Sequence, residues 1–467
     1  MRNVAVVDIG KTNVKLALVQ EGCLQELAVV TKANTPRAGP PYRHFDLAGH
    51  WNFFLHHLAA FHAQLGVDAI SVTTHGASAV LLDAADQLAC PMLDYEDPGP
   101  TSLAASYDAL RPSFAESGSS RLPLGLNLGA QLHWLLSAQN EFSGLSRHLS
   151  RIVTYPQYWG FLLTGEAACD LCSLGCHTDL WNPRQGDFSP LVERLGLTGR
   201  IASPRRPDET LGNLRPALAA ATGLSPKTPV SVGIHDSNAS LYPHLVCRQG
   251  PFSVVSTGTW VICMAIDGDN RQLDPSRDTL INVDALGRPV ASARFMGGRE
   301  FERLSEGHTG PITQADRAAV LARKMAVLPA VEANSGPFPG HRMRWTAQPE
   351  SVGQRLVAVS FYLALMTRTC LDLIGTRGPV IVEGPFARNS HYLAMLSSLS
   401  PEGVEAATSV TGTSVGAALL CLGAARAPDT QPVPRPIDAA DLCAFAKTWR
   451  SLVVREEFDF RSSLGVF

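Results

Sequence analysis

The chain has 467 residues, of which 45% are hydrophobic and 17% are charged. This composition supplies enough apolar side chains for large cores and excludes intrinsic disorder, and the length favours two domains. The 39 lysines and arginines nearly balance the 42 aspartates and glutamates, which argues against nucleic acid or a membrane surface as a partner.

The start of the chain and its cysteines predict a cytoplasmic protein. Asp8 follows the first residue too closely for a secretory signal, and no segment is expected to reach the roughly 18 apolar residues that a membrane-spanning helix needs. The ten cysteines are expected to be reduced, inert thiols. Cys169 and Cys172 have the spacing of a zinc or redox pair, but the sequence offers no second ligand pair at the usual spacing. A metal or redox protein is therefore the weakest hypothesis.

In chain order, the hydrophobic pattern alternates between strands and helices. In the first half it predicts strands at 3–9, 14–20 and 69–74 and helices at 47–65, 129–139 and 156–164. Near residue 240 the pattern restarts, with paired strands inside 251–266, a helix at 352–374, a strand at 379–383, a helix at 389–399 and a proline-rich tail at 426–437. This alternation predicts an α/β fold, and the repeated strand-turn-strand opening suggests two lobes.

The first chemical signal is VAVVDIGKTNVKLAL at 4–18, where an acid ends a buried strand and a glycine-led turn returns into another strand. Backbone amides of such a turn can bind phosphate oxygens, and Thr12 and Asn13 add donors. A Walker A loop is excluded because Ala5 stands where that motif needs a glycine and because a strand, not a helix, follows. The alternative is a plain hairpin with an exposed lysine.

The second signal is PVSVGIHDSNAS at 229–240, where a short apolar strand leads into a glycine, His235 and Asp236. Phosphoryl transfer needs a carboxylate that accepts the hydroxyl proton, together with donors and Mg²⁺ for the phosphate charge. Asp236 fits the carboxylate role. The alternative is that Asp236 caps a helix and that His235 only lines a wall.

Two further turns complete the pattern. VVSTGTWVICM at 254–264 is a second strand-turn-strand element with hydroxyl side chains around a glycine, and IVEGPFARNS at 381–390 is a strand, a glycine and a helix. The first could close on phosphates, and the flat backbone of the second could approach an adenine or ribose. Each is a common turn when taken alone, and the order of the four blocks carries the argument. We expect the turns to meet around one triphosphate.

In this order the four blocks resemble the FGGY carbohydrate kinases, a branch of the sugar kinase, Hsp70 and actin superfamily, over nearly the whole chain. DIGKTNVK resembles the first phosphate loop, GIHDS the catalytic-base segment, STGTW the second phosphate loop and EGPFARN the adenosine segment. YPQYWGFLLTGE and HTDLWNPRQGDFS, at 155–166 and 177–189, resemble the linker helix and strand of the first lobe. The resemblance implies an α/β fold of two actin-like, ribonuclease H-like lobes with an interdomain cleft. The implied domains are 1–240, 241–430 and a tail at 431–467.

The resemblance also implies ATP and Mg²⁺ as cofactors and assigns roles by position. Asp236 would be the general base, and Asp8 and Asp236 would hold the metal. The phosphate contacts would be Gly10, Lys11, Thr12, Asn13, Thr257, Gly258 and Thr259, the adenosine contacts Gly384, Pro385 and Asn389, and the sugar contacts His75, Glu96, Asp97 and His235.

Three departures from the family pattern accompany these roles. Lys11 stands where many members have a small hydroxyl residue, EGPF replaces the usual glycine run, and His235 is unusual beside the base. The length class looks most like the fuculose and rhamnulose kinases. The expected function is therefore ATP-dependent phosphorylation of a hydroxyl of a polyol or small sugar, such as a ketopentose or 6-deoxyketohexose, by a monomer or homodimer. The alternative is an actin-like nucleotide-dependent switch or a sugar-binding module without turnover.

Overall fold

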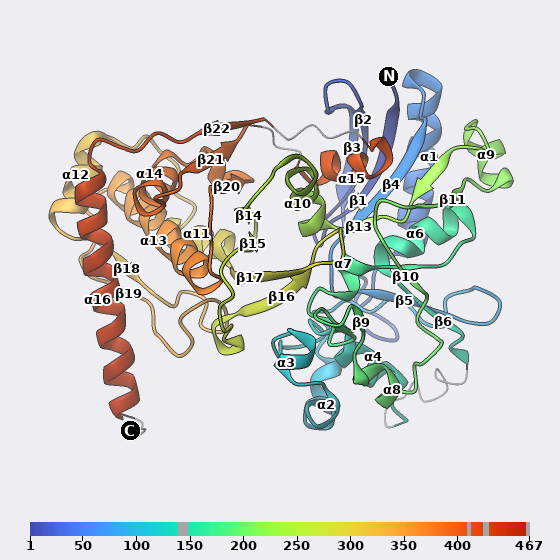
Figure 1. Cartoon of the computed structure of the whole chain (residues 1–467), viewed down its shortest axis with the longest axis horizontal. Helices are drawn as coiled ribbons and strands as arrows, with labels where there is room; N and C mark the ends of the chain where they lie inside the picture. Colours follow the sequence, from blue (N-terminus) through green and yellow to red (C-terminus); the bar gives the residue numbers. More distant parts are fainter. Residues whose placement is uncertain (139–147, 409–411, 424–428, 464–467) are drawn as a thin grey trace. The chain divides into compact units, whose positions relative to one another are not determined.

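The structure is a computed structural model that describes residues 1–138, 148–408, 412–423 and 429–463 (Figure 1). The contacts divide the chain into two compact units. Unit 1 is Met1–Arg248, Ile281–Val290 and Thr411–Ala427, and unit 2 is Gln249–Leu280, Ala291–Val410 and Pro428–Phe467. Each unit contains a sheet and its helices, so the predicted α/β fold of two lobes is confirmed. The functional boundaries at 240 and 430 stay a prediction.

The sheet of unit 1 has the strand order β11-β12-β4-β1-β2-β3, and β13 also pairs with β4. Strands β1 and β2 form the predicted antiparallel hairpin, and β1 and β13 each run parallel to β4. The central strands β1 and β4 are buried over almost their whole length, as expected for parallel strands covered on both faces. The bounds are β1 Asn3–Ile9, β2 Asn13–Gln20, β3 Gln25–Ala33, β4 Ala69–Thr74, β11 Thr210–Asn213, β12 Pro229–Ser231 and β13 Ile234–His235.

The longest helix of unit 1, α1, begins after Asp46, whose carboxylate accepts a hydrogen bond from the Gly49 amide at 3.1 Å. Its buried face packs Phe54 against Trp159 of α6. The predicted helix at 129–139 is found as α4, and residue 139 lies outside the described residues. The helices of unit 1 are α1 Leu47–Leu65, α2 Ala104–Leu110, α3 Phe114–Ser117, α4 Leu128–Leu136, α6 Tyr155–Thr164, α7 Leu171–Leu174, α8 Pro190–Arg194, α9 Pro216–Thr222, α10 Asp236–Cys247, α15 Gly412–Leu422 and the 3₁₀ turn η1 Gly99–Leu103. Its short strands are β5 Ala79–Leu82, β6 Arg151–Thr154, β7 Cys169–Asp170, β8 Trp181–Asn182, β9 Asp187–Phe188 and β10 Pro204–Arg205.

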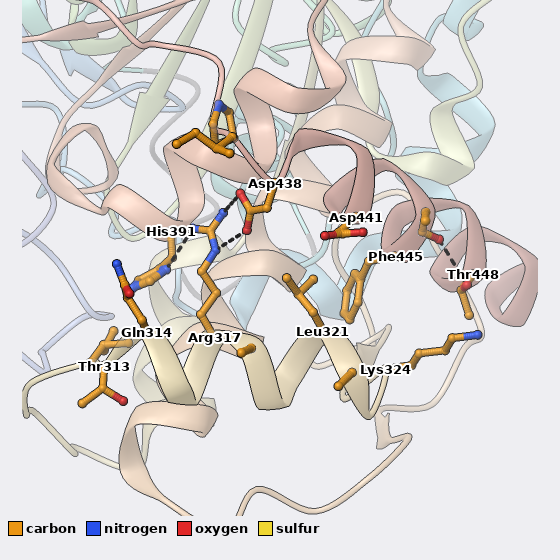
Figure 2. Close-up of a pocket in the computed structure, with 16 residues that line it drawn as sticks. Thr313, Gln314, Arg317, Leu321, Lys324, His391, Asp438, Asp441, Phe445 and Thr448 are labelled. Carbon is orange, nitrogen blue, oxygen red and sulfur yellow. Dashed lines mark hydrogen bonds and ion pairs between the residues drawn. The ribbon is translucent and has the colours of Figure 1, made fainter.

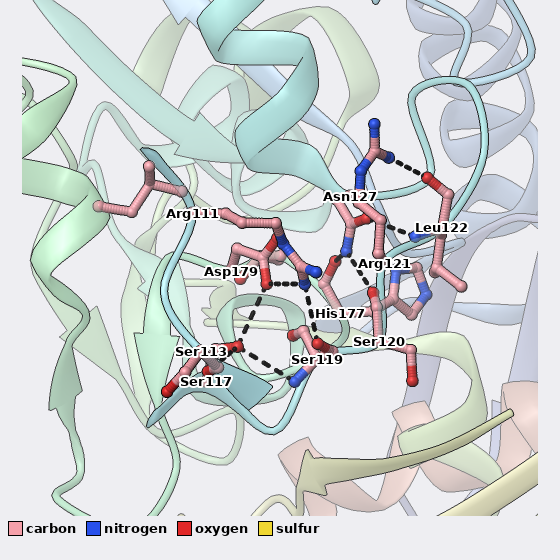
Figure 3. A network of polar contacts seen from close by, with 12 residues as sticks. Arg111, Ser113, Ser117, Ser119, Ser120, Arg121, Leu122, Asn127, His177 and Asp179 are labelled. Atoms are coloured by element: carbon pink, nitrogen blue, oxygen red, sulfur yellow. Dashed lines mark hydrogen bonds and ion pairs between the residues drawn. The ribbon is translucent and has the colours of Figure 1, made fainter. Parts of the chain in front are cut away.

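A buried ion pair fixes the segment that follows α7 (Figure 3). Arg111 donates to both carboxylate oxygens of Asp179, at 3.0 and 2.9 Å, and Tyr107 donates to Asp179 at 2.6 Å. His177 and Asp179 both have positive φ angles, 42° and 64°. A backbone held in this region costs energy and persists only where the surroundings determine it. The network therefore fixes the position of the neighbouring Cys176.

The sheet of unit 2 has the order β16-β17-β15-β14-β20-β21-β22, in which the end of β16 and the start of β17 belong to the segment Ile281–Val290 of unit 1. Strand β14 is antiparallel to β15 and parallel to β20, which repeats the relation of β1 to β2 and β4. The bounds are β14 Phe252–Thr257, β15 Val261–Ile266, β16 Thr279–Val283, β17 Pro289–Phe295, β20 Val380–Glu383, β21 Val404–Ala407 and β22 Thr430–Pro432, with a separate pair of β18 Val327–Leu328 and β19 Arg344–Trp345.

The helices of unit 2 differ from the prediction at several places, and the short helices α11 and α12 were not predicted. By length and composition α13 could cross a membrane, so the prediction that no segment would reach that length was wrong; 83% of its apolar window is buried inside the protein, as in a core helix. The sequence analysis also missed α16, which follows the proline-rich tail. The helices are α11 Gly297–Ser305, α12 Gln314–Ala322, α13 Val352–Leu373, α14 Ser390–Leu399 and α16 Ala439–Ser463, with the 3₁₀ turns η2 Pro275–Arg277 and η3 Pro385–Arg388.

Candidate active site

Three parallel strands of unit 1 end at the same edge of the sheet. Ile9 of β1 pairs with Thr74 of β4, and Thr74 pairs with His235 of β13. The residues that follow these strands are the first glycine of the predicted phosphate turn, His75 and Asp236. The topology therefore brings together side chains from the beginning, the first quarter and the middle of the chain. Ligands of open α/β sheets bind at such carboxyl ends.

A glycine makes the position of β13 possible. Gly233 connects β12 to β13 with a φ of 92°, and a Cβ atom there would lie 2.8 Å from the carbonyl oxygen of Val72. Only a residue without a side chain fits this close approach to β4. The glycine that the sequence analysis noted before Asp236 therefore positions the strand that delivers it.

The Asp236 carboxylate has one oxygen held and one oxygen open. Oδ1 accepts hydrogen bonds from the Ser237 amide at 2.6 Å and the Ser237 hydroxyl at 3.3 Å, and His235 Nε2 lies 3.2 Å away. Among the described residues, Oδ2 has no such partner, and the side chain is 32% exposed. Helix α10 begins at Asp236, while His235 occupies the N-cap position. The helix-cap alternative therefore does not describe the contacts of this carboxylate.

His235 lies behind the carboxylate rather than in solvent. Its ring is 5% exposed, and Nε2 also lies 3.8 Å from the sulfur of Cys176. Burial alone would lower the pKa of His235, but the charges of Cys176 and Asp236 raise it above its ordinary value. His235 was predicted to contact the sugar; in this structure its described polar contacts are with Asp236 and Cys176.

His75 offers a buried acceptor at the same edge. Burial lowers its pKa to about 4, so the ring is neutral near pH 7. The charges of Asp236, Lys11 and Asp94 also influence this pKa. Nδ1 lies 3.1 Å from the Gly76 carbonyl oxygen, which assigns the proton to Nδ1. Nε2 is then an acceptor, and it is buried without a hydrogen-bond partner in the described part of the chain. A hydroxyl group of a ligand would satisfy it.

The two predicted acids of the loop at 94–97 have different surroundings. Asp97 is buried, and its two oxygens accept hydrogen bonds from the backbone amides of Gly99 and Arg43, each at 2.8 Å. Glu96 is half exposed and lies 3.4 Å from the Lys11 ammonium and 3.5 Å from the Arg43 guanidinium. Asp97 therefore shapes the loop, whereas Glu96 is open to a ligand.

Lys11 does not extend into solvent from the first turn. Its ammonium forms an ion pair with Asp94, which is fully buried, and lies over the rings of Phe45 and Tyr95 at 5.0 and 4.6 Å. Asp94 was not among the predicted site residues. Asp94 lies in the same short acidic run as the two predicted acids, Glu96 and Asp97, but nothing in the sequence indicated which acid of the run would face Lys11.

The rest of the first turn is available to a phosphate group. The Gly10 amide donates to the Asn13 carbonyl at 2.9 Å, which closes the turn, and the side chain of Asn34 donates to the Gly10 carbonyl at 2.8 Å. Thr12 and Asn13 are exposed. These contacts fix the backbone of the turn and leave the two polar side chains at its tip.

Asp8 stands at the end of β1 with its carboxylate partly occupied. Oδ2 lies 3.1 Å from the Lys15 ammonium and accepts a hydrogen bond from Ser414 at 3.2 Å. Burial would lower the pKa of Lys15, but Asp8 and Glu26 raise it, so the lysine stays charged. The other oxygen, Oδ1, has no such partner among the described residues. Mg²⁺ in kinase sites keeps several waters and takes one or two carboxylates plus substrate phosphates, so this donor set fits the ion.

In unit 2, the second turn is joined to the EGPF segment. The Thr257 hydroxyl donates to the Glu383 carbonyl and accepts from the Phe386 amide at 3.1 Å. Gly384 has a φ of 80°, and a Cβ atom there would overlap the carbonyl oxygen of Thr257. The predicted phosphate contact Thr257 and the predicted adenosine contact Gly384 are thus neighbours, and the Thr257 hydroxyl is already used.

The remainder of the second turn meets a helix that the sequence analysis missed. The Gly298 amide, in the first turn of α11, donates to the Thr259 carbonyl at 3.2 Å, and a Cβ atom on Gly298 would overlap the backbone of Gly258. The signal was present as two glycines between strand β17 and an amphipathic segment. The predicted Gly258 and Thr259 therefore lie beside a helix N-terminus, where anions are favoured.

A cavity of about 550 Å³ lies in unit 2 next to η3. Pro385 and Asn389, both predicted adenosine contacts, line it. Asn389 also caps α14 by accepting a hydrogen bond from the Tyr392 amide at 3.0 Å, and it donates to Ser360 at 2.9 Å. Cavities of roughly 300–1,000 Å³ hold small ligands. The other lining residues, which the sequence analysis missed, are Phe301, Gly310, Ile312, Leu356, Ser360, Phe386, Arg388, Ser390 and His391.

A second cavity of about 960 Å³ lies between α12 and the start of α16 (Figure 2). Arg317 crosses it and donates to both oxygens of Asp438, at 2.7 and 2.8 Å. Ile312 and His391 line both cavities, so the two adjoin. This ion pair holds the segment just before α16 against α12.

Comparison with known proteins gives consistent matches along the chain. Residues 4–242 match the N-terminal domain of the FGGY family of carbohydrate kinases, and residues 249–431 match the C-terminal domain of carbohydrate kinase FGGY. A solved carbohydrate kinase from Novosphingobium aromaticivorans is 36% identical over 98% of this chain and 100% of that chain, with a TM-score of 0.88. A xylulose kinase from Lactobacillus acidophilus is 15% identical over 100% and 99%, with a TM-score of 0.80, which shows the fold alone.

One curated relative also matches. The chain is 25% identical over 294 residues to an L-fuculokinase of Salmonella typhi. The match covers 58% of each protein, so it spans little more than half the length of that relative.

Proposed function

Because the chain belongs to the FGGY family of carbohydrate kinases, as its motifs predicted, we propose that it transfers a phosphoryl group from ATP to a hydroxyl of a small sugar or polyol. Asp236 is the general base. The observation that supports this best is the meeting of Asp236, His75 and the first turn at one edge of the sheet of unit 1.

The acceptor half of the reaction uses the open oxygen of Asp236. The acceptor hydroxyl loses its proton to Oδ2, its oxygen bonds to the γ-phosphorus, and the bond between that phosphorus and the bridging oxygen breaks to leave ADP. His235 and Ser237 hold Oδ1 and so fix the direction of Oδ2. His75 Nε2 accepts a hydrogen bond from another hydroxyl of the acceptor.

The nucleotide half uses unit 2. The cavity beside Pro385 and Asn389 holds the adenosine, and the backbone at Gly258 and Thr259, next to the first turn of α11, binds phosphate oxygens. Asp8 Oδ1 would hold Mg²⁺ directly or through water, and the ion, when bound, neutralises charge that develops on the phosphates.

For the acceptor we propose a ketose such as a ketopentose or a 6-deoxyketohexose. Two observations support a ketose. The length of the chain is similar to that of the fuculose and rhamnulose kinases, and the curated relative is an L-fuculokinase, a name that states the substrate of that protein. We also propose a cytoplasmic monomer or homodimer. All ten cysteines are free thiols, which agrees with a reducing compartment.

A coupled assay of ADP release across ketoses, aldoses and polyols tests the proposal. We expect one group of acceptors to give release that depends on both ATP and the acceptor. Asp236→Asn should lower kcat by roughly 10²-fold or more while circular dichroism shows a folded chain. Near-normal sugar-dependent turnover by the folded variant would refute the role of Asp236. Silence across the whole panel, with ATP still bound, would favour the nucleotide-dependent switch.

A further inference from the structure

Lys11 belongs to a charge network that joins the first turn to the loop at 94–97. Its ammonium pairs with Asp94 and lies 3.4 Å from Glu96. Arg43 contacts the same two acids, with its Nε 2.7 Å from Asp94 and its Nη2 3.5 Å from Glu96. The Glu96 amide also donates to Asp94 at 3.2 Å. One side chain of the phosphate turn is therefore built into the loop that was expected to read the sugar.

The network is balanced in charge. Two cations, Lys11 and Arg43, meet two carboxylates, Asp94 and Glu96, and the aromatic rings of Phe45 and Tyr95 enclose the Lys11 ammonium. A lysine that served as a phosphate contact would need a free charge at its tip. Here the ammonium already forms ion pairs with two acids, and one of them, Asp94, is completely buried.

The charge balance also affects which acceptors can bind at this edge. Within unit 1, the other cations close to the site are Lys15, which pairs with Asp8 and Glu26, and His235, which pairs with Asp236. Among the described residues, the carboxylate of a sugar acid would therefore meet no unpaired cation on this edge, and it would lie near the carboxylates of Glu96 and Asp236. Like charges brought together in a partly desolvated site repel one another, whereas uncharged hydroxyl groups meet no such repulsion.

We propose that Lys11 is a specificity-determining residue of the acceptor site, and that the acceptor is an uncharged sugar or polyol rather than a sugar acid. The proposal rests on the proposed function and narrows its substrate class. It also moves Lys11 from the nucleotide contacts, where the family resemblance put it, to the acceptor.

Substitution of Lys11 separates the two roles. Lys11→Met keeps the length of the side chain and removes the charge, so it breaks the charged hydrogen bond to Asp94 that holds the loop at 94–97. Loss of one such bond should raise KM for the acceptor by about tenfold. KM for ATP should stay within about twofold of the wild type, because in this proposal Lys11 makes no phosphate contact. Calorimetric titration with the acceptor alone should show the same loss without any turnover. Lys11→Arg keeps the charge and should recover most of the affinity.

A lysine of similar chemistry provides the matched control. Lys32 donates to the Gly49 carbonyl at 2.9 Å and lies over the Phe53 ring at 5.1 Å, and neither partner was assigned to the site. Lys32→Met should leave both KM values unchanged. If Lys11→Met raises KM for ATP instead, and the acceptor titration is unchanged, Lys11 is a phosphate contact and the proposal is wrong.

Glu96→Gln tests the charge balance. It removes one carboxylate beside Lys11 and leaves a net positive charge in the network, so kcat/KM for a sugar acid should rise. The probes are an aldose and the aldonate with the same carbon skeleton. We expect the wild type to prefer the uncharged partner by about tenfold or more in kcat/KM, and Glu96→Gln to narrow that preference at least threefold, a change of about 0.7 kcal/mol.

Glu209→Gln is the control for a carboxylate outside the site, because Glu209 forms a partly buried ion pair with Arg205 at 2.8 Å. It should not change the preference. Equal or better use of the aldonate by the wild type, or no response to Glu96→Gln, would overturn the proposal while leaving the kinase assignment intact. A wild type without sugar-dependent ADP release would overturn both.

Discussion

The acceptor edge of unit 1 and the nucleotide cavity of unit 2 recognise their ligands in different ways. In unit 1 the site is made of charged and titratable side chains that follow three strand ends, and most of them contact one another. In unit 2 the site is made of close backbone approaches, such as Gly384 against Thr257, and of a mainly apolar cavity. Side-chain chemistry sets the first site and backbone shape sets the second.

The contrast is informative because the two sheets share a plan. Strand β14 pairs antiparallel with β15 and parallel with β20, just as β1 pairs antiparallel with β2 and parallel with β4. The same topology therefore presents charge at one edge and glycine-rich backbone at the other. Substitutions that remove a charge should affect unit 1 most, and substitutions that add a methyl group should affect unit 2 most.

After loss of the base, the next largest effect is expected where a methyl group enters a close backbone approach beside the nucleotide cavity. Gly384→Ala places a Cβ atom on the Thr257 carbonyl at a φ of 80°, and overpacking of this kind costs about 1–3 kcal/mol. The shift should displace Pro385 and raise KM for ATP about tenfold or more, by the same estimate. Acceptor binding, measured calorimetrically without nucleotide, should not change.

Gly403→Ala is the matched control for this substitution. Gly403 is also in unit 2 and has a φ of 94°, but no atom lies within 4 Å of the position of its Cβ. It carries the same backbone strain without the overlap. Equal effects of the two substitutions on KM for ATP would mean that strain, not contact with Thr257, explains the result.

Most of the fold could be predicted because its signals are local. The hairpin β1–β2, helix α1, strand β4 and helix α13 each follow from a hydrophobic period within a few turns of chain. The edge strand β3 and the helix α16 were not predicted, and α16 follows directly on a proline-rich segment at 426–437, where helices are not expected.

The site was predictable by position and not by contact. Asp236 was expected at the site because it follows a short apolar strand and a glycine, and His75 because the family resemblance implied it; both follow strands that end at one edge of the sheet of unit 1. The partners of Lys11 and Thr257 could not be predicted, because Asp94 is 83 residues from Lys11 and Glu383 is 126 residues from Thr257. Nothing in a local pattern specifies which of several acids or carbonyls will meet a side chain so distant in sequence.

A smaller effect is expected from the residue that holds the base. His235→Leu removes the group 3.2 Å from Asp236 Oδ1 and should lower kcat about tenfold, the worth of one charged hydrogen bond. KM for the acceptor should change little, because in our proposal His235 acts through Asp236. His235→Gln, whose side-chain amide can reach the same place, should restore part of kcat.

A rise in KM for the acceptor with kcat unchanged would instead make His235 a direct sugar contact, as the family resemblance implied. Cys176→Ala is a useful companion, because Cys176 touches the same Nε2 atom at 3.8 Å but not the carboxylate. It should lower kcat less than His235→Leu does.

The smallest effects concern stability. They come from one buried titratable group in each unit, and they test whether burial acts in opposite directions on the two groups. Burial lowers the pKa of His75 to about 4 from 6.5, whereas burial raises the pKa of Glu300 to about 7 from 4.5. Folded unit 1 resists protonation of His75, so this stabilisation is present above pH 6.5 and is lost as the pH falls toward 4. Folded unit 2 resists ionisation of Glu300, so that stabilisation is present below pH 4.5 and is lost as the pH rises toward 7.

Denaturant unfolding at a series of pH values measures both. Relative to the wild type, His75→Gln should remove a slope of about 1 kcal/mol per pH unit between pH 6.5 and 4, and Glu300→Gln should remove a slope of opposite sign between pH 4.5 and 7. Glutamine suits the second test because it stays neutral and can still accept the hydrogen bond that Tyr362 donates at 3.0 Å. Slopes of the same sign in the two variants would show that burial does not act oppositely on the two groups.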